Sequence, residues 1–526
     1  MKKLLIFISL FLVSFLIRAY LVGQIPGILN RDEAALAYNA YLLNETGHDE
    51  WGKSWPLSLE SFGDYKLSGY VYALVGLFKI LPLNDWVVRL PSLLAGSILV
   101  ILGFFFAKVV KFRESWARLF AILLATAPVF IFYSRMAFEA NLALSLFVFS
   151  LTLLLAQVKN KNRVAIDLLA LPLALFSVFT YNAPLLLLPF ILPIIIWLRG
   201  YKKWEKWLLP VAGLVLVIGI AGSQLLSLSS QKSGITIFQD ETVWIDSIKY
   251  RLQFNGVWQT VLGNKYVYYS YLITQNYVKS FSSQFLVNAQ GGHPWHSLPN
   301  YGHLSTVIYF FGIIGVLAVI YELLLAIKAH KFANKIRLRA SLLYLLLISL
   351  IPSVITVDAP HATRSLLFFF LFNLFTLIGL KTTYHLIRDH TRIRKNALFI
   401  AFSILLTISS SKYLQAYLVN YPHQQQALKP GFDLIINQVD GQYSNQPIAV
   451  IDEEGYQYIL LAWYLKVPPQ QFFDTVIRQL PDKIGFRYGQ QVGRYHFIAR
   501  VADRNEQEKT VIKWNEVTAN WEILEF

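Results

Sequence analysis

The sequence contains no cysteine, so the protein has neither a disulfide bond nor a thiolate metal site. Charged residues are scarce as well. They make up 15% of the 526 positions, whereas hydrophobic residues make up 55%. A soluble domain with a single core cannot bury that much apolar surface, so the composition indicates a membrane protein.

The net charge is +16, but the Lys and Arg residues lie in short clusters between apolar runs. The positive-inside rule expects this distribution in cytoplasmic loops, so we expect no nucleic-acid partner. Apolar runs of about 20 residues, enough to cross a bilayer core of roughly 30 Å, recur along the chain. We predict a cytoplasmic N-terminus and eleven spans, at about residues 4–22, 86–109, 116–134, 139–157, 164–180, 182–198, 207–224, 304–327, 339–357, 363–380 and 396–413.

A further apolar run at residues 67–82 is short and contains Lys79. Counting it as a twelfth span would put the next basic loop outside, so we predict an interfacial or re-entrant helix. The outer face then carries a loop at 23–85, a long aromatic loop at 225–303 and a tail at 414–526. In the tail, a helix-like segment around Asn437, strand-like runs at 448–451 and 495–501, and a helix-like run at 456–466 predict a small α/β domain.

The centres of the predicted spans are almost free of ionisable residues. Ion-coupled transporters need carboxylates or broken helices near the midplane, so this pattern disfavours them. Charged residues and one histidine gather instead at the outer ends of the spans. They are Asp32, Glu33, Asp64, Lys66, Arg89, Arg135, Glu139, Asp358, His361 and Arg364.

Asn30 and Glu33 have the spacing of a capping box, which predicts a helix that starts there and stops near Gly47. Asp32 would lie in the first turn, where the helix dipole favours an ionised carboxylate. Such a carboxylate at the membrane surface could act as a general base toward an acceptor hydroxyl. A plain helix N-terminus explains the motif equally well.

Lys66 follows Asp64 and Tyr65, and Arg89 opens the second span. Both cations could extend along the lipid boundary or bind a lipid phosphate. Arg135 lies on a very short outer turn. There, bidentate contact between guanidinium and phosphate explains it better than a local ion pair with a nearby glutamate.

His361 and Arg364 form a His-x-x-Arg pair that either presents two donors to one anion or anchors the turn at the interface. In the aromatic loop, tryptophan and tyrosine indicate either an interfacial belt or stacking on sugars. His293 and His296 lie in the same loop without a supporting carboxylate cluster, so we predict no metal site.

The series DEAALAYNAYLLNETG, VVRLPSLLAGS and FYSRMAFEANLAL resembles the GT-C integral-membrane glycosyltransferases, in the branch of protein O-mannosyltransferases and aminoarabinose transferases. The resemblance covers about residues 20–200, and the DAPHATR turn extends it to about 380. It implies an all-α polytopic fold of about 11 transmembrane helices over residues 1–413, followed by the extracytoplasmic α/β domain at 414–526.

The resemblance implies an inverting hexosyl- or pentosyltransferase of the cytoplasmic membrane. Such an enzyme moves one sugar from a polyprenyl-phosphate donor to a protein, lipid or cell-wall glycan, without a required metal or other cofactor. Asp32 matches the first-loop aspartate that acts as the catalytic base in this family, and Glu33 matches the residue that accompanies this aspartate. Glu139 stands where many relatives have an aspartate. Lys66 and Arg135 match cations near the donor phosphate. We expect Arg89, His361 and Arg364 to join them and Asp64 and Tyr65 to contact substrate.

Elementary chemistry agrees, since cations stabilise a departing lipid phosphate and the reaction needs charges at the outer boundary. We therefore predict that Asp32, Arg135 and their partners converge in one pocket at the outer edge of the bilayer. Three alternatives stay open: a flippase for lipid-linked glycans, a ligase that moves whole glycans from a pyrophosphate carrier, and a non-enzymatic envelope-binding protein.

Overall fold

The computed structural model describes residues 2–156, 162–200, 202–229, 235–288, 295–331, 333–390, 397–424, 428–443, 446–482 and 485–526. The chain forms two compact units. The bundle unit comprises Met1–Arg18, Leu94–Ser134 and Ala140–Ala416, and the mixed unit comprises Ala19–Leu93, Arg135–Glu139 and Tyr417–Phe526. The predicted domain division at 413/414 stays a prediction.

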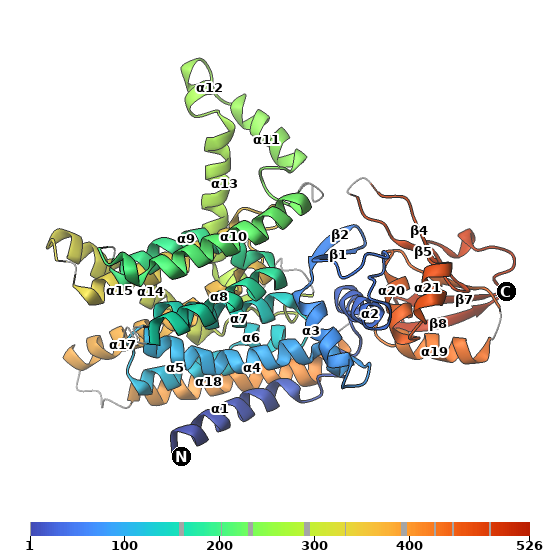
Figure 1. Cartoon of the computed structure of the whole chain (residues 1–526), viewed down its shortest axis with the longest axis horizontal. Coiled ribbons are helices and arrows are strands. Elements are labelled where there is room, and N and C mark those ends of the chain that lie inside the picture. Colours follow the sequence, from blue (N-terminus) through green and yellow to red (C-terminus); the bar gives the residue numbers. More distant parts are fainter. Residues whose placement is uncertain are drawn as a thin grey trace. The chain divides into compact units, whose positions relative to one another are not determined.

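The bundle unit is built from helices, several of which run side by side (Figure 1). Helix α4 begins in the mixed unit and continues into the bundle. The helices are α1 (Lys2–Ala19), α4 (Asp85–Val109), α5 (Glu114–Thr126), α6 (Pro128–Ser134), α7 (Glu139–Leu155), α8 (Arg163–Thr180), α9 (Asn182–Arg199), α10 (Leu208–Ser229), α11 (Glu241–Arg251), α12 (Val257–Val261), α13 (Lys265–Ser280), α14 (Thr306–Lys328), α15 (Asn334–Ile348), α16 (Ile351–Val354), α17 (Leu366–His390) and α18 (Ala397–Gln415).

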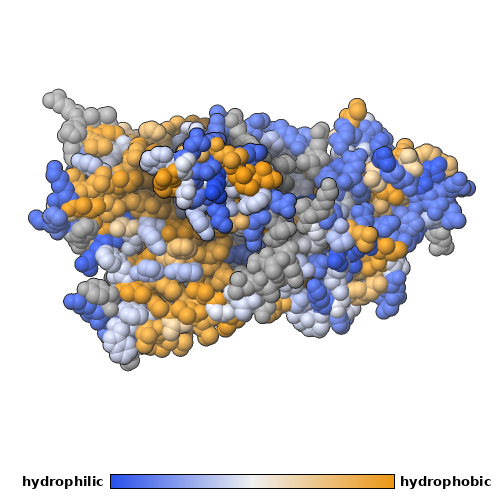
Figure 2. Space-filling view, turned by 90° about the horizontal axis from the view of Figure 1, so that it is seen from above, coloured by the Kyte–Doolittle hydropathy of each residue, from blue (hydrophilic) through white to orange (hydrophobic). Residues whose placement is uncertain are grey.

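Among the described residues, seven helices are long and apolar enough to cross a membrane, and α5 with α6 passes the same test as a bent pair. The three remaining predicted spans coincide with the shorter apolar helices Leu5–Ala19, Glu139–Leu155 and Leu208–Ser223. Every predicted span is therefore helical, and the protein is a multi-pass membrane protein. The hydrophobic surface over the helices of the bundle unit agrees with this assignment (Figure 2).

The bend between α5 and α6 has a local cause. The two helices meet at 56° across Ala127 and Pro128. Pro128 has no N–H to donate to the carbonyl of Leu124. The next N–H, that of Val129, donates to the carbonyl of His303 at 3.0 Å. The carbonyl of Ala125 therefore does not receive the helical hydrogen bond that Val129 would otherwise donate. The break thus frees two carbonyls in an apolar setting.

Arg18 of α1 binds both freed carbonyls. Its Nη2 donates to Leu124 O at 3.1 Å and its Nη1 to Ala125 O at 3.3 Å. The same guanidinium contacts Ser14 of its own helix and Ser134 at the end of α6. Because buried backbone groups must be satisfied within the protein, this one side chain stabilises the break.

Replacing Arg18 with Leu is expected to lower the thermal unfolding temperature of the purified protein. Each buried carbonyl left without a donor costs about 1–3 kcal/mol. Thermal unfolding followed by size-exclusion chromatography measures the effect, with Arg500→Leu as the control because 79% of the Arg500 side chain is exposed. Equal unfolding temperatures for the two variants would contradict this account of the break.

Helices α14 and α17 approach each other closely through glycines. A Cβ atom on Gly315 would lie 1.9 Å from the carbonyl oxygen of Phe375, and one on Gly379 would lie 1.8 Å from that of Phe311. No larger residue fits at either position without separating the helices. Small residues serve this purpose at helix contacts in membranes.

The mixed unit combines helices with two sheets. Strands β1 and β2 form a hairpin in which Lys66 lies opposite Leu59. The ten-residue helix α3 rises only about 15 Å and is too short to cross a bilayer core. The elements are α2 (Arg31–Thr46), β1 (Ser58–Ser61), β2 (Asp64–Leu67), α3 (Gly69–Phe78), α19 (Phe432–Gln442), β3 (Ile448–Ile451), α20 (Gln457–Tyr464), α21 (Pro469–Thr475), β4 (Ile477–Arg478), β5 (Gly489–Val492), β6 (Tyr495–Ile498), β7 (Thr510–Asn515) and β8 (Asn520–Glu525).

The second sheet confirms the predicted α/β tail. Its strand order is β4-β5-β6-β3-β7-β8, and the central strand β3 is parallel to both of its neighbours. All four residues of β3 are buried, which explains its uninterrupted apolar sequence. The predicted strands at 448–451 and 495–501 correspond to β3 and β6, and the predicted helix at 456–466 corresponds to α20.

Candidate active site

Helix α2 begins as the sequence predicts. The side chain of Asn30 accepts from the backbone N–H groups of Asp32 and Glu33, both at 2.9 Å, and Glu33 accepts from the N–H of Asn30 at 3.1 Å. The helix ends at Gly47, which has a left-handed conformation with φ of 74°. The capping box therefore fixes two adjacent carboxylates in the first turn of α2.

The Glu33 carboxylate is buried and fully engaged. Its Oε1 accepts from Arg89 Nε at 3.0 Å and from the N–H of Ala137 at 2.7 Å. Its Oε2 accepts from Arg89 Nη2 at 3.2 Å and from the N–H of Asn30. Two carboxylate oxygens offer about four acceptor sites, and these four donors fill them. Glu33 is thus placed to connect α2, α4 and the segment around Ala137 rather than to take a proton.

Arg89 is fully buried and has no N–H group left for a phosphate in this conformation. Besides its bonds to Glu33, its Nη1 donates to the carbonyls of Val22 and Pro26 at 2.7 and 2.9 Å. Its Nη2 also donates to the carbonyl of Ile28 at 2.9 Å. These contacts use all five guanidinium donors. Arg89 therefore holds surrounding protein groups, and its predicted phosphate contact stays a prediction.

Arg135 makes similar contacts. Its Nη1 and Nη2 donate to the carbonyls of Tyr20 and Ile25 at 2.7 and 3.1 Å, and its guanidinium lies 4.7 Å from the ring centre of Tyr417. The side chain is fully buried. Together Arg89 and Arg135 therefore hold the backbone between α1 and α2, which the sequence had not indicated.

Asp32 and Lys66 form an accessible pair. Lys66 Nζ lies 2.5 Å from Asp32 Oδ1, and 46% of the Asp32 side chain is exposed against 9% for Lys66. Asp32 comes from the first turn of α2 and Lys66 from β2, so the capping box and the β hairpin together position the pair. An ionised carboxylate beside an ammonium group suits acid–base chemistry near a phosphate.

The other site residues predicted in the mixed unit have different surroundings. Tyr65 donates its hydroxyl to Glu60 at 3.1 Å, and the ammonium of Lys53 also contacts Glu60 at 3.3 Å. Glu139 is half-buried at the first position of α7. The backbone of Asp64 belongs to β2, but its side chain lies outside the described residues.

Sequence reasoning missed a buried ion pair between the first loop and the tail. Glu50 accepts from Asn39 Nδ2 at 3.0 Å, from Tyr458 OH at 3.0 Å and from Arg478 Nη2 at 3.3 Å. The Arg478 guanidinium also lies 3.9 Å from the ring centre of Trp51. Burial raises the pKa of Glu50, against the opposing effect of Arg478. No local pattern marks Glu50 as buried, because its partners come from distant segments.

A second contact supports the start of α2. The hydroxyl of Tyr464 accepts from the N–H of Leu29 at 2.9 Å and donates to Asp85 at 2.9 Å. Trp463 also donates to Asp85, at 2.9 Å. Helix α20 of the tail therefore fixes the residue that precedes the Asn30 cap.

The bundle unit contains the other predicted cations. Arg364 Nη1 donates to Thr356 Oγ1 at 2.9 Å and to Asp358, while His361 Nε2 lies 3.6 Å from Asp358. Burial opposes ionisation of Asp358, but Arg364 and His361 outweigh burial, so the pKa of Asp358 is lowered. Arg364 and His361, which we predicted to bind one anion, thus both contact the carboxylate of Asp358.

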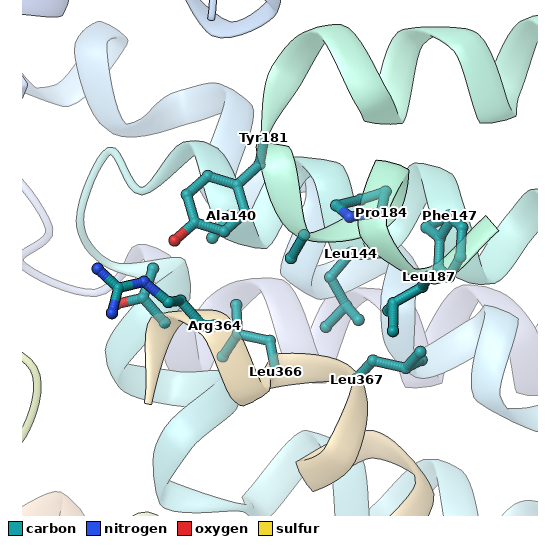
Figure 3. Close-up of a pocket in the computed structure, with 11 residues that line it drawn as sticks. Ala140, Leu144, Phe147, Tyr181, Pro184, Leu187, Arg364, Leu366 and Leu367 are labelled. Atoms are coloured by element: carbon teal, nitrogen blue, oxygen red, sulfur yellow. The ribbon is translucent and has the colours of Figure 1, made fainter. Parts of the chain in front are cut away.

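Arg364 also lines a pocket of the bundle unit. Figure 3 shows the guanidinium and the hydroxyl of Tyr181 at one end of this pocket, with Leu144, Leu187 and Leu367 farther along. The pocket therefore has one cation at the end of an otherwise mostly apolar lining. Tyr181 was missed, although the polar triplet Thr180-Tyr181-Asn182 between two apolar runs marks this helix end.

Thr363, which also lines the pocket, belongs to a cluster of polar side chains. The hydroxyls of Tyr133 and Thr363 lie 2.9 Å apart, and His296 Nδ1 lies 3.2 and 3.0 Å from them. The ring of His361 packs against that of His296 at 4.8 Å. His293 lies outside the described residues. Within the described ranges, no group of three or more His, Cys, Asp or Glu side chains is arranged to hold a metal ion.

No family model matches the sequence, and no curated protein matches it. Solved structures do match. The oligosaccharyltransferase of Archaeoglobus fulgidus, tethered to an acceptor peptide, is 13% identical with a TM-score of 0.51 over 87% of this chain. The same enzyme with zinc and sulfate gives 13% identity and a TM-score of 0.52, again over 87% of this chain.

This chain spans only 63% and 61% of the length of those two chains. ArnT of Cupriavidus metallidurans, bound to undecaprenyl phosphate, is 12% identical with a TM-score of 0.49, covering 89% of this chain and 85% of its own. At such identities the likeness concerns the fold alone. The protein therefore has the GT-C fold of membrane glycosyltransferases, with a small C-terminal α/β domain.

Proposed function

We propose that this protein is an inverting glycosyltransferase that moves one sugar from a polyprenyl-phosphate donor to an acceptor at the outer face of the cytoplasmic membrane. The pair of Asp32 and Lys66 carries the proposal, because it combines an accessible carboxylate with a cation at 2.5 Å on a GT-C fold. The acceptor is a hydroxyl of a protein, a lipid or a cell-wall glycan.

In the proposed reaction Asp32 removes the proton from the acceptor hydroxyl while its oxygen attacks the anomeric carbon. The bond between that carbon and the phosphate oxygen breaks on the opposite face, and polyprenyl phosphate leaves with the bonding electrons. Lys66 stabilises the developing negative charge. Arg364 and His361, which belong to the bundle unit, remain candidates for contact with the donor phosphate.

No metal ion is needed in this scheme. An ammonium group already contacts Asp32, and its positive charge opposes a divalent cation at that carboxylate. Arg89 and Arg135 contribute indirectly, since they hold the chain that leads into α2. We assign Glu33 the same positioning role and leave Glu139, Asp64 and Tyr65 as candidates for contact with substrate.

We also propose the orientation. Lys and Arg residues concentrate in the loops that we place inside, so the N-terminus is cytoplasmic and the tail is extracytoplasmic. The site at the start of α2 then faces the outer side of the membrane, where a lipid-linked sugar and an exported acceptor can meet.

A second candidate is the transfer of a whole glycan from a pyrophosphate-linked carrier to a peptide. It is favoured by one observation: the two matching structures reported above with TM-scores of 0.51 and 0.52 are those of an oligosaccharyltransferase. The lipid product separates the two reactions, because single-sugar transfer releases polyprenyl phosphate and glycan transfer from a pyrophosphate carrier releases polyprenyl pyrophosphate.

The test compares the lipids and envelope glycans of cells with and without the gene by mass spectrometry. Cells without the gene should accumulate a polyprenyl-phosphate sugar and lose one sugar unit from an envelope acceptor. Purified protein supplied with that donor and acceptor should release polyprenyl phosphate. Unchanged glycans together with no release of a polyprenyl phosphate or pyrophosphate would refute both reactions.

Replacing Lys66 with Gln is expected to lower kcat/KM for the donor by about 10- to 100-fold, since a hydrogen bond to a charged group contributes roughly 1.5–3 kcal/mol. Lys66→Arg should restore part of the rate. The control is Lys53→Gln, a more exposed lysine of the same loop that pairs with Glu60. If Lys66→Gln and Lys53→Gln had the same kcat/KM, Lys66 would have no part in donor use.

A further inference from the structure

A helical hairpin projects from the bundle unit. The projecting hairpin, residues 241–280, consists of α11, α12 and α13. Figure 1 shows α9 and α10 running along the bundle and α13 rising across their direction, with α11 and α12 at its far end. Since spanning helices run along the membrane normal, an element that extends across them runs along the membrane plane.

Aromatic side chains pack between the helices of the hairpin, whereas other large apolar side chains are exposed on its surface. The rings of Tyr250 and Tyr268 pack at 5.2 Å between α11 and α13. Val257, the first residue of α12, is 75% exposed. Figure 2, which looks onto the end of the hairpin, shows hydrophobic side chains beside hydrophilic ones. The exposed apolar residues include Trp244, Ile248, Leu252, Val257, Trp258 and Val261.

A lipid surface fits this composition. Tryptophan and tyrosine are enriched where a bilayer meets water, and lysine and arginine there contact lipid head groups. The hairpin supplies the cations Lys249, Arg251 and Lys265 beside its tryptophans. The hairpin thus combines exposed aromatic and aliphatic side chains with cations, a composition typical of segments that lie in the interface.

The apolar surface also continues onto the spanning helices. Phe190 of α9 and Leu216 and Ile220 of α10 are exposed on helices apolar enough to face lipid. Helix α10 precedes the hairpin in the chain, and Figure 1 shows α13 rising from the side of the bundle where α9 and α10 lie. The bilayer that surrounds α9 and α10 therefore reaches the base of the hairpin.

We propose that the projecting hairpin lies along the membrane–water interface and inserts the apolar side chains of α11 and α12 among the lipids. Its partner is the bilayer that surrounds the bundle. This interaction is independent of the proposed chemistry, because it depends only on the exposed side chains and on the spanning helices.

The base of the hairpin connects this anchor to the pocket with Arg364. Asn276 of α13 is buried and donates to the carbonyl of Val354 at 2.9 Å. The segment that precedes α11 forms an isolated antiparallel bridge between Thr236 and Thr356, and the Thr356 hydroxyl accepts from Arg364. A hairpin fixed at the membrane surface thus helps to hold the turn that positions Arg364.

The chain has no native cysteine, so single cysteines can be labelled without background. We would place nitroxide labels at Leu252→Cys and Val257→Cys in the full-length protein, in vesicles of phosphatidylethanolamine and phosphatidylglycerol. Power-saturation measurements then compare collisions with oxygen, which concentrates in lipid, and with a water-soluble nickel complex. The matched control is Val517→Cys, at a position that is 94% exposed in the turn between β7 and β8.

The labels on the hairpin should show a several-fold higher ratio of oxygen to nickel collisions than the label at position 517. Elution as a single peak in gel filtration verifies that each variant is folded. Equal ratios at all three positions would overturn the proposal, and a hairpin that binds a protein instead of lipid would give that result. Sugar transfer by the unlabelled protein tests the proposed function separately.

Discussion

Replacing Asp32 with Asn is expected to slow sugar transfer by about 10²- to 10⁴-fold, the range that general base catalysis contributes. Asparagine has nearly the same shape and keeps the backbone N–H that donates to Asn30, so the start of α2 should persist. It cannot accept a proton from the acceptor hydroxyl. Initial rates of polyprenyl phosphate release by the purified variant measure the effect.

The control for this substitution is Glu45→Gln, an exposed carboxylate near the other end of α2, which should retain the full rate. Donor binding by Asp32→Asn should also persist, because Lys66 remains. Full activity of Asp32→Asn would end the assignment of the base. If Asp32→Asn lost both the transfer rate and its affinity for the sugar donor, Asp32 would instead act by holding Lys66 in place.

Replacing Arg89 with Met is expected to destabilise the protein by about 3–5 kcal/mol, because it leaves the Glu33 carboxylate buried without its cation. This cost is a large part of the stability of most domains, so little folded protein should accumulate. The yield of a single gel-filtration peak and the unfolding temperature of that fraction measure the loss. The carbonyls of Val22, Pro26 and Ile28 lose their donors as well.

The matched control is Arg118→Met, which breaks an exposed pair with Glu114 on α5 and should cost less than about 1 kcal/mol. Adding Glu33→Gln to Arg89→Met should recover part of the stability, because the uncompensated charge is removed. If Arg89→Met were as stable as Arg118→Met, the buried pair would not hold this part of the fold.

Features with local causes could be predicted from the sequence. The capping box at Asn30, the helix end at Gly47 and the apolar strand at 448–451 each depend on a few consecutive residues. The predicted spans coincide with helices because length and hydropathy alone specify them. The short helix at 69–78 was distinguished from a span by its length and by the basic loops, which would otherwise change sides.

The partners of the charged residues could not be predicted. Sequence shows that a charge lies near the end of a span, but burial and contacts depend on segments far along the chain. Glu33 and Arg89 therefore resembled site residues, whereas the structure shows their polar atoms engaged inside the protein. Arg478 lies 428 residues from Glu50, and no local signal connects them. Asp32 combines the predicted charge with an exposed side chain, and Lys66 contacts it.

The contact of Arg18 with the broken helix has a consequence for synthesis of the protein. The ribosome delivers α1 to the membrane before α5 and α6 exist, so Arg18, in the last turn of α1, first extends toward the membrane surface. It can take its buried position only after the carbonyls of Leu124 and Ala125 have been made. In a nascent chain that stops short of residue 124, the Arg18 guanidinium should therefore still contact water or lipid head groups.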